Sequence, residues 1–344
     1  MDGQANTPAE KVSFTRTLKS WVDDYVQNKE MGIENFLVSR LGSAFTETNP
    51  TELKDMAQTI SSEISSYEQS KEEIKNTIDE GGSKEEWLSN LLQKETEELG
   101  SENQTKVLGN LHNGLMEAMG IPTADELKEE EKPPLQSSVI AKSVSDLATG
   151  RVMQALGDET EADAEEEDVE GSEFVEEALK SNSDTELKAL ASGTMVVLHK
   201  MGKLPMIPQT APIQAVINIA CFAVDHAKTV VQIARKEISL TEGLSRIARD
   251  SFAAMRGILR GGRGKFTPEG IAEALPILKK PMALVNKISQ GITNLIGDEK
   301  VQEKIALVRE RIIPVAQNFA REFVQTTVSV VQRVATGIKN FLFG

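Results

Sequence analysis

Three residues in one apolar stretch have side chains that could do chemistry together. Cys221, Asp225 and His226 bring a thiol, a carboxylate and an imidazole within six residues, and such groups form nucleophilic sites when they touch. In a continuous helix, however, residues five apart project about 140° from each other around the axis. The thiol and the imidazole therefore do not meet, and we interpret Cys221 as a small buried apolar residue. The sequence predicts no catalytic residue here.

The sequence contains no metal-binding motif either. His112, His199 and His226 are the three histidines, and none has a second histidine at metal-ligand spacing. We predict no metal site and no cofactor. An enzyme whose site is assembled from scattered carboxylates is the weakest of the three functions that we consider.

A short basic, glycine-rich stretch is the better candidate for a binding site. The sequence RGGRGKF carries cations just before a predicted helix start at Thr267, where free backbone amides favour an anion. It is not a phosphate-binding loop, because Phe266 follows the lysine where that motif has Ser or Thr. We predict an anion-binding site, with an ordinary solvated turn as the alternative. Its residues are Arg256, Arg260, Arg263 and Lys265.

Charge is divided unevenly along the chain. Of the net charge of −15, residues 1–200 contribute −24 and residues 201–344 contribute +9. This asymmetry predicts a basic half that meets an anionic surface. The candidates are an acidic membrane, the chain's own acidic linker and nucleic acid, which is disfavoured because Phe266 is the one aromatic residue near the cations.

The stretch 212–235 is the most continuously apolar part of the chain and predicts a helix buried on several sides. A membrane span needs about 20 largely uncharged residues. Asp225, His226 and Lys228 interrupt that length, and each charge is costly at a bilayer centre. We therefore expect the central helix of a helical bundle.

A heptad pattern marks the clearest helix in the first half. Asn49 can cap it, Pro50 suits its first position, and Gly81 and Gly82 end it. Its apolar seam resembles that of a coiled coil, with one flaw at Lys71. The seam predicts a contact surface, and ordinary core packing is the alternative. Its heptad positions are Leu53, Ile60, Tyr67 and Ile74, interleaved with Ala57, Ile64, Lys71 and Ile78.

The last helix is predicted to be long and kinked. Helical periodicity runs almost without pause over 298–343, and Pro314 should bend it by removing a backbone donor. Its end combines basic residues with Phe341 and Phe343, which we predict as interaction residues. Docking into the bundle and insertion into a lipid interface are the two fates that we consider.

Together these patterns predict an all-α protein of two helical bundles. Few aromatics and the absence of strand alternation favour helix packing. We expect a non-enzymatic interaction or assembly protein whose basic half binds an anionic surface or an oligomeric partner. The alternative is a membrane-active protein that inserts its apolar C-terminal helices into a bilayer. The predicted parts are a disordered start (1–9), an acidic bundle (10–156), a disordered acidic linker (157–172) and an apolar, basic bundle (173–344).

The first residues carry no apolar segment of the kind found in a secretory signal. We accordingly expect an intracellular, cytoplasmic protein, with attachment at the periphery of a membrane as a further option. We expect a protein partner or self-association, and an anionic membrane surface is a second candidate partner.

Overall fold

The structure is a computed structural model of the 344-residue chain, and it describes residues 13–79, 90, 94, 103, 107, 170–180, 184–260 and 281–310. Over these residues the fold is all-helical and contains no strand, as the sequence predicts. The first group of helices is α1 (Phe14–Gln27), the short 3-10 turn η1 (Lys29–Met31), α2 (Ile33–Ala44) and α3 (Pro50–Asp79). The second group is α7 (Glu173–Lys180), α8 (Thr185–Lys200), α9 (Ile213–Ala234), α10 (Leu240–Arg260) and α12 (Pro281–Thr293).

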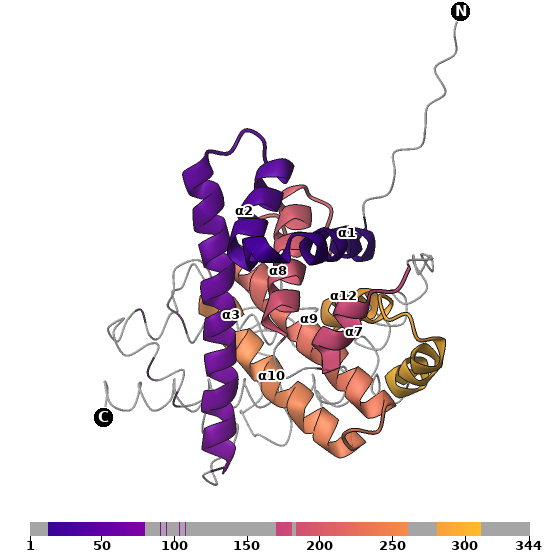
Figure 1. The fold of residues 1–344 in the computed structure, drawn as a ribbon. Coiled ribbons are helices and arrows are strands. Elements are labelled where there is room, and N and C mark those ends of the chain that lie inside the picture. The colour runs from indigo at the N-terminus through magenta and orange to yellow at the C-terminus, as the bar shows by residue number, and fades with distance from the viewer. Residues whose placement is uncertain are drawn as a thin grey trace, which may run out of the picture.

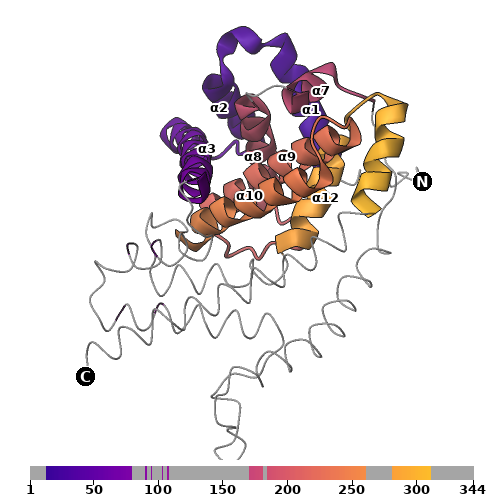
Figure 2. The same ribbon diagram turned by 90° about the horizontal axis from the view of Figure 1, so that it is seen from below.

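Helix α9 is the central element of this arrangement. It packs against α3, α7, α8, α10 and α12, and Figure 2 shows it in the middle of the described helices, beside α8 and α10. Its apolar residues cover most of its circumference, so each neighbour finds an apolar face to bury. The predicted central helix is therefore confirmed.

Helix α3 is the longest described helix and lies along one side of the other described helices (Figure 1). The Asn49 side chain caps it as predicted, because its Oδ1 accepts a hydrogen bond from the Glu52 backbone nitrogen at 2.9 Å. Helix α1 starts in the same way, with the Ser13 hydroxyl accepting from the Arg16 nitrogen at 3.2 Å. Local sequence thus fixes where both helices begin.

Helices on the two sides of the predicted linker share one hydrophobic core. Leu18 of α1, Leu37 of α2 and Ile60 of α3 are fully buried in the same cluster as residues of α8, α9 and α10. Helices α1 and α2 both pack against α8, and α3 packs against α8, α9 and α10. Among the described residues, the two predicted bundles are therefore not separate packing units.

The end of the predicted linker is part of this folded unit. Ser172 is buried, and its backbone nitrogen donates to the Leu295 carbonyl at 2.7 Å. Gly171 lies so close to Gly297 that an added Cβ would approach the Gly297 Cα to 2.4 Å. Residues 170–172 are thus held beside the end of α12, which corrects the predicted boundary, and the rest of the linker, 157–169, lies outside the described residues.

The predicted C-terminal helix is described only at its start. Residues 299–310 are helical, and the Asp298 carboxylate caps them by accepting from the Lys300 and Val301 nitrogens at 3.0 and 3.2 Å. Val301 and Ile305 face the core. The kink at Pro314 and the residues Phe341 and Phe343 lie outside the described residues.

Candidate functional site

The predicted anion-binding residues that the structure describes lie against α3. Arg256 is buried, and its guanidinium donates to the Glu73 carboxylate at 2.6 Å and to the Ser70 hydroxyl at 3.1 Å. Arg260 is half-buried at the end of α10, and its charge acts on Glu63. The structure therefore directs Arg256 toward an anionic group of its own chain. Arg263 and Lys265 lie outside the described residues.

The other arginines of α10 are also paired. Arg246 donates to Glu242 at 2.7 Å and to Gln232 at 2.9 Å. Arg249 donates to the buried Asp250 carboxylate at 3.0 Å. The arginines of α10 thus contact acceptors from α3, α9 and α10 itself.

The predicted interaction residues of α3 lie in the chain's own core. Leu53 is buried, and Ile60, Tyr67 and Ile74 are almost completely so. The surfaces that cover them come from α2, α8, α9 and α10. In this structure the heptad seam is therefore an internal contact. The flaw in the seam has a partner as well, because the Lys71 ammonium lies 2.5 Å from the Asp225 carboxylate of α9.

A buried network of charges surrounds this contact. The Lys188 side chain of α8 is 1% exposed. Its Nζ lies 2.8 Å from Asp225 and 3.0 Å from Asp184, and it also pairs with Glu68 of α3. The Tyr67 hydroxyl donates to Asp225 at 2.9 Å. One ammonium group therefore ties α3, α8 and α9 together.

The charged state of this network follows from its geometry. Burial opposes ionisation of Asp225, but Lys188 and Lys71 hold the pKa of this carboxyl well below its ordinary value. Burial likewise opposes the charge on Lys188, yet Asp225 and Asp184 raise the pKa of its ammonium well above the ordinary value. The charges of Asp225 and Lys188 are thus kept by their neighbours, and neither of these two groups is poised to exchange a proton near neutral pH.

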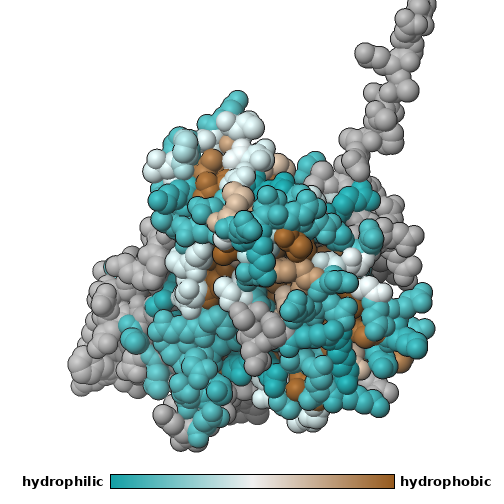
Figure 3. All heavy atoms as spheres, viewed as in Figure 1, coloured by the Kyte–Doolittle hydropathy of each residue, from teal (hydrophilic) through white to brown (hydrophobic). Residues whose placement is uncertain are grey.

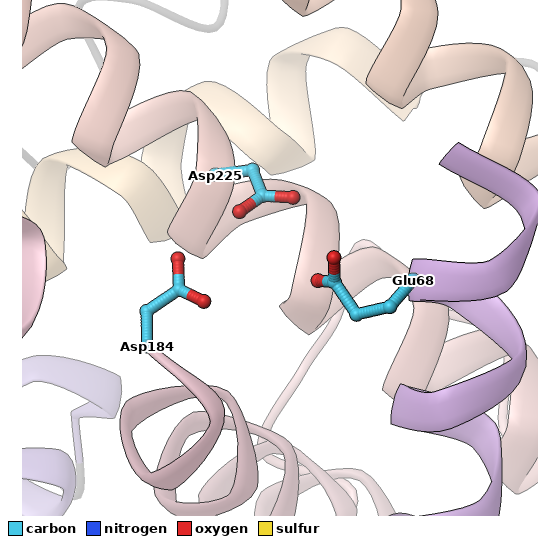
Figure 4. Close-up of side chains that lie close together, drawn as sticks. All are labelled: Glu68, Asp184 and Asp225. Carbon is cyan, nitrogen blue, oxygen red and sulfur yellow. The ribbon is translucent and has the colours of Figure 1, made fainter. Parts of the chain in front are cut away.

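Three carboxylates point toward one another in this network. Glu68, Asp184 and Asp225 come from α3, the cap of α8 and α9 (Figure 4), and an oxygen of each lies within 4.8 Å of the others. Oxygen ligands at this spacing suit a shared cation. The Lys188 ammonium pairs with all three, so the cation that they share is a lysine, and we interpret the cluster as an ion-pair network.

A second buried polar group joins α9 to α12. The His226 Nδ1 lies 3.0 Å from the Ser289 hydroxyl, and its Nε2 is buried without a hydrogen-bond partner in the described structure. A serine beside a histidine has the composition of a nucleophile and its base. Ser289 is completely buried, and burial with the nearby Arg309 lowers the pKa of His226 to about 4. We interpret this pair as a structural hydrogen bond.

Cys221 behaves as the sequence predicts. Its thiol is completely buried next to the Ser192 hydroxyl, and burial raises its pKa to about 12. A reactive cysteine needs a thiolate near neutral pH. Cys221 therefore carries no nucleophilic chemistry in this fold.

Sequence reasoning missed the network itself. Its members lie far apart in the chain, and pairing them requires the packing of α3 on α8 and α9. A signal was nevertheless present, since Lys71, Lys188 and Asp225 each interrupt an apolar face of a predicted helix. Charges at such positions are costly unless they are paired, so these three interruptions jointly indicate a buried ion-pair cluster. No family model matches this chain, and no curated protein or solved structure matches it either.

Proposed function

We propose that the protein is an interaction or assembly protein whose basic C-terminal half binds an acidic helical surface. The observation that carries this proposal is the pairing of two α3 carboxylates with cations of the C-terminal helices. Glu68 pairs with Lys188, and Glu73 pairs with Arg256 at 2.6 Å. The anionic surface in this structure is the chain's own helix α3.

Polar contacts hold α3 between Glu63 and Glu73. The Glu63 carboxylate accepts a hydrogen bond from the Asn218 amide of α9 at 3.0 Å, and Glu68 and Glu73 follow at intervals of five residues. Ten residues of helix span about 15 Å. Three different helices, α8, α9 and α10, thus each recognise one carboxylate of α3 over that distance.

The contact combines this charge recognition with an apolar groove. Tyr67 and Ile60 fill the space between α3 and the helices beneath it. Laying the apolar face of an amphipathic helix into a groove is a common way of recognising helical partners. Complementary charges at such a contact supply specificity and orientation. The groove over α8, α9 and α10 therefore fits an acidic amphipathic helix.

A competition experiment tests this function. The full chain carries the double substitution Glu68→Gln and Glu73→Gln, which weakens the binding of its own α3 to the groove. A labelled peptide of residues 50–79 is then added as a competitor for the groove. The wild-type peptide should bind at least about tenfold more tightly than a peptide with the same two substitutions, because each charged contact favours the acidic form. Fluorescence anisotropy at low and physiological salt measures both affinities.

The matched control removes the cations instead. In a chain with Lys188→Gln and Arg256→Gln, the preference for the wild-type peptide should disappear or reverse, since the cations that pair with Glu68 and Glu73 are gone and Asp184 and Asp225 remain beside position 68. Equal binding of the two peptides to the chain with intact cations would contradict the proposal. A weaker preference at high salt would agree with it, because the Glu68 and Glu73 carboxylates are partly exposed and salt screens them.

A membrane-active function is the second candidate, and helix α9 supports it. It is the one described helix that is long and apolar enough to cross a bilayer, and 83% of its most apolar window is buried. The face seen in Figure 3 is largely hydrophilic, so insertion requires the bundle to open. Flotation with neutral and acidic liposomes, followed by a carbonate wash, tests this. Retention through the wash supports insertion, whereas release by salt indicates peripheral binding to acidic lipid.

A further inference from the structure

The seam between α9 and α12 contains a buried histidine that has no partner for a second proton. His226 is 3% exposed, and its Nδ1 lies 3.0 Å from the Ser289 hydroxyl of α12. Its Nε2 is buried without a hydrogen-bond partner among the described residues. A neutral imidazole carries a proton on one nitrogen, whereas the charged form carries one on each. Charging His226 therefore places an unpaired donor or a buried positive charge in this seam.

The charge that acts on this ring is already positive. Arg309 of the helix at 299–310 is half-buried, and its guanidinium donates to the Ser289 carbonyl at 3.3 Å and to the Thr293 hydroxyl of α12. It makes no ion pair in the part of the chain that the structure describes. A like charge disfavours the charged form of a neighbouring group. A proton on His226 would thus face a second cation instead of a counter-ion.

The other charged groups around the seam are exposed or paired elsewhere. Lys287 of α12 is exposed, as are the charged residues of the helix at 299–310 other than Arg309. The remaining neighbours of α9 bring their charges to partners at other points. These pairs are Lys71 of α3 and Lys188 of α8 with Asp225, Asp184 with Lys228, Glu176 of α7 with Arg235, and, from α10, Arg246 with Gln232 and Arg249 with Asp250.

The two sides of α9 respond differently to acid. Figure 2 shows α12 and α3 on different sides of α9. On the side of α3, Lys188 and Lys71 hold the pKa of Asp225 well below its ordinary value, so this carboxylate stays charged. Burial raises the pKa of Asp250 to about 6, so the folded state takes up this proton readily and is stabilised by it. Mild acid therefore preserves the contacts around α3 and α10, while it adds a buried charge beside α12.

We propose that residues 281–310, which comprise α12 and the helix at 299–310, form an acid-sensitive arm that leaves α9 when His226 takes up a proton. The main packing partners of α12 are α9 and α1, whereas α9 is also held by α3, α7, α8 and α10. The arm can thus open while α9 stays in the core. Opening exposes Val285, Ile288 and Ile292, which are almost completely buried in the closed form. The groove for α3 is not involved, so the inference does not depend on the proposed function.

The pH range of opening follows from the histidine. An imidazole that is free in water titrates near pH 6.5, whereas burial and Arg309 lower the pKa of His226 to about 4 in the closed form. The open arm thus binds the proton more readily, and opening becomes more favourable as pH falls below about 6.5. For complete exposure of the ring, these two values predict about twentyfold more frequent opening at pH 5 than at pH 7.

Hydrogen exchange of the full chain, followed by mass spectrometry at pH 7 and pH 5, tests the arm. Wild type and His226→Gln are compared at the same pH, so that the intrinsic pH dependence of exchange cancels. The glutamine can still contact the Ser289 hydroxyl but takes up no proton. Relative to their ratio at pH 7, peptides from 281–310 should exchange about twentyfold faster at pH 5 in the wild type than in the variant. The corresponding ratio for peptides of α3 and α8 should stay near one.

A second buried histidine provides the matched control. His199 also has an unpartnered nitrogen, but its Nε2 lies 3.1 Å from the Ala211 carbonyl just before α9. His199→Gln should therefore leave the acid response of residues 281–310 as it is in the wild type. Arg309→Gln should reduce that response at least about twofold, because it removes the like charge beside His226.

Two results would overturn the arm. One is an equal acid response of residues 281–310 in the wild type and in His226→Gln. The other is a loss of protection at pH 5 that affects α3 and α8 as much as α12, since the whole fold would then open. If His226→Gln does not fold, Arg309→Gln decides, and an unchanged response in that variant overturns the inference. The peptide competition for the groove is a separate measurement, so either proposal can fail without the other.

Discussion

The Asp225 carboxylate provides the most direct test of how the helices are held together. It accepts contacts from Lys71 at 2.5 Å, Lys188 at 2.8 Å and the Tyr67 hydroxyl at 2.9 Å. The substitution Asp225→Asn keeps the size of the side chain but removes its charge. The ammonium groups of Lys71, Lys188 and Lys228 then face only two carboxylates in these pairs, those of Glu68 and Asp184. One buried cation is left uncompensated.

The expected loss of stability is large. Removing one partner of a buried ion pair costs about 3 to 5 kcal/mol. Domains are typically stable by about 5 to 15 kcal/mol, so Asp225→Asn should remove about a fifth or more of the unfolding free energy. Denaturant titration followed by circular dichroism measures this loss. A suitable control is Lys75→Ala, whose exposed pair with Glu72 at 3.5 Å should contribute less than about 1 kcal/mol.

A second substitution separates charge balance from packing. In the variant that combines Asp225→Asn with Lys71→Met, the remaining two ammonium groups again face two carboxylates. At least about half of the lost stability should return, because replacing both partners of a buried pair by uncharged groups is often nearly neutral. A loss below about 1 kcal/mol for Asp225→Asn, or no recovery in the double variant, would refute the reasoning.

Three further predictions concern packing and pH. Gly193→Ala should cost about 1 to 3 kcal/mol, because the new Cβ would lie 2.6 Å from the Trp21 ring, whereas Gly42→Ala, with its nearest contact at 3.3 Å, should be tolerated; equal melting temperatures would contradict this. Burial and the nearby Asp225 raise the pKa of Asp250 to about 6, so the wild type should lose stability relative to Asp250→Asn as pH rises from about 4 to 6. The pKa of His226 is lowered to about 4, so the wild type should lose stability relative to His226→Gln as pH falls from about 6.5 to 4; parallel stability curves in either pair would contradict the corresponding prediction.

Helix positions could be predicted from the sequence where local physics decides them. Asn49 and Pro50 mark the start of α3 because a capping side chain and a proline satisfy the first backbone groups without help from the rest of the fold. The apolar circumference of residues 212–235 likewise indicates α9, since only a helix surrounded by others can bury so many faces. These signals lie within one helix, and a single sequence contains them in full.

Pairings between helices could not be predicted in the same way. The arginines of α10 suggest an external anion as readily as an internal one, and the choice depends on whether a carboxylate such as Glu73 packs beside them. Residues 73 and 256 are far apart in the chain, so no local pattern connects them. The division of charge into an acidic and a basic half is explained in part by this contact, because Glu73 of α3 pairs with Arg256 of the basic half.

The position of Lys71 shows how a signal within one helix combines with a pairing between helices. In a heptad seam a charged residue is a flaw if the seam meets an apolar partner, and it reduces stability there. Opposite Asp225 the same lysine becomes a selective element, because a groove with an apolar residue at that point would leave its ammonium unpaired. A buried charge thus excludes more wrong partners than an apolar residue does. A groove that binds α3 must therefore place a carboxylate opposite Lys71, as Asp225 does here.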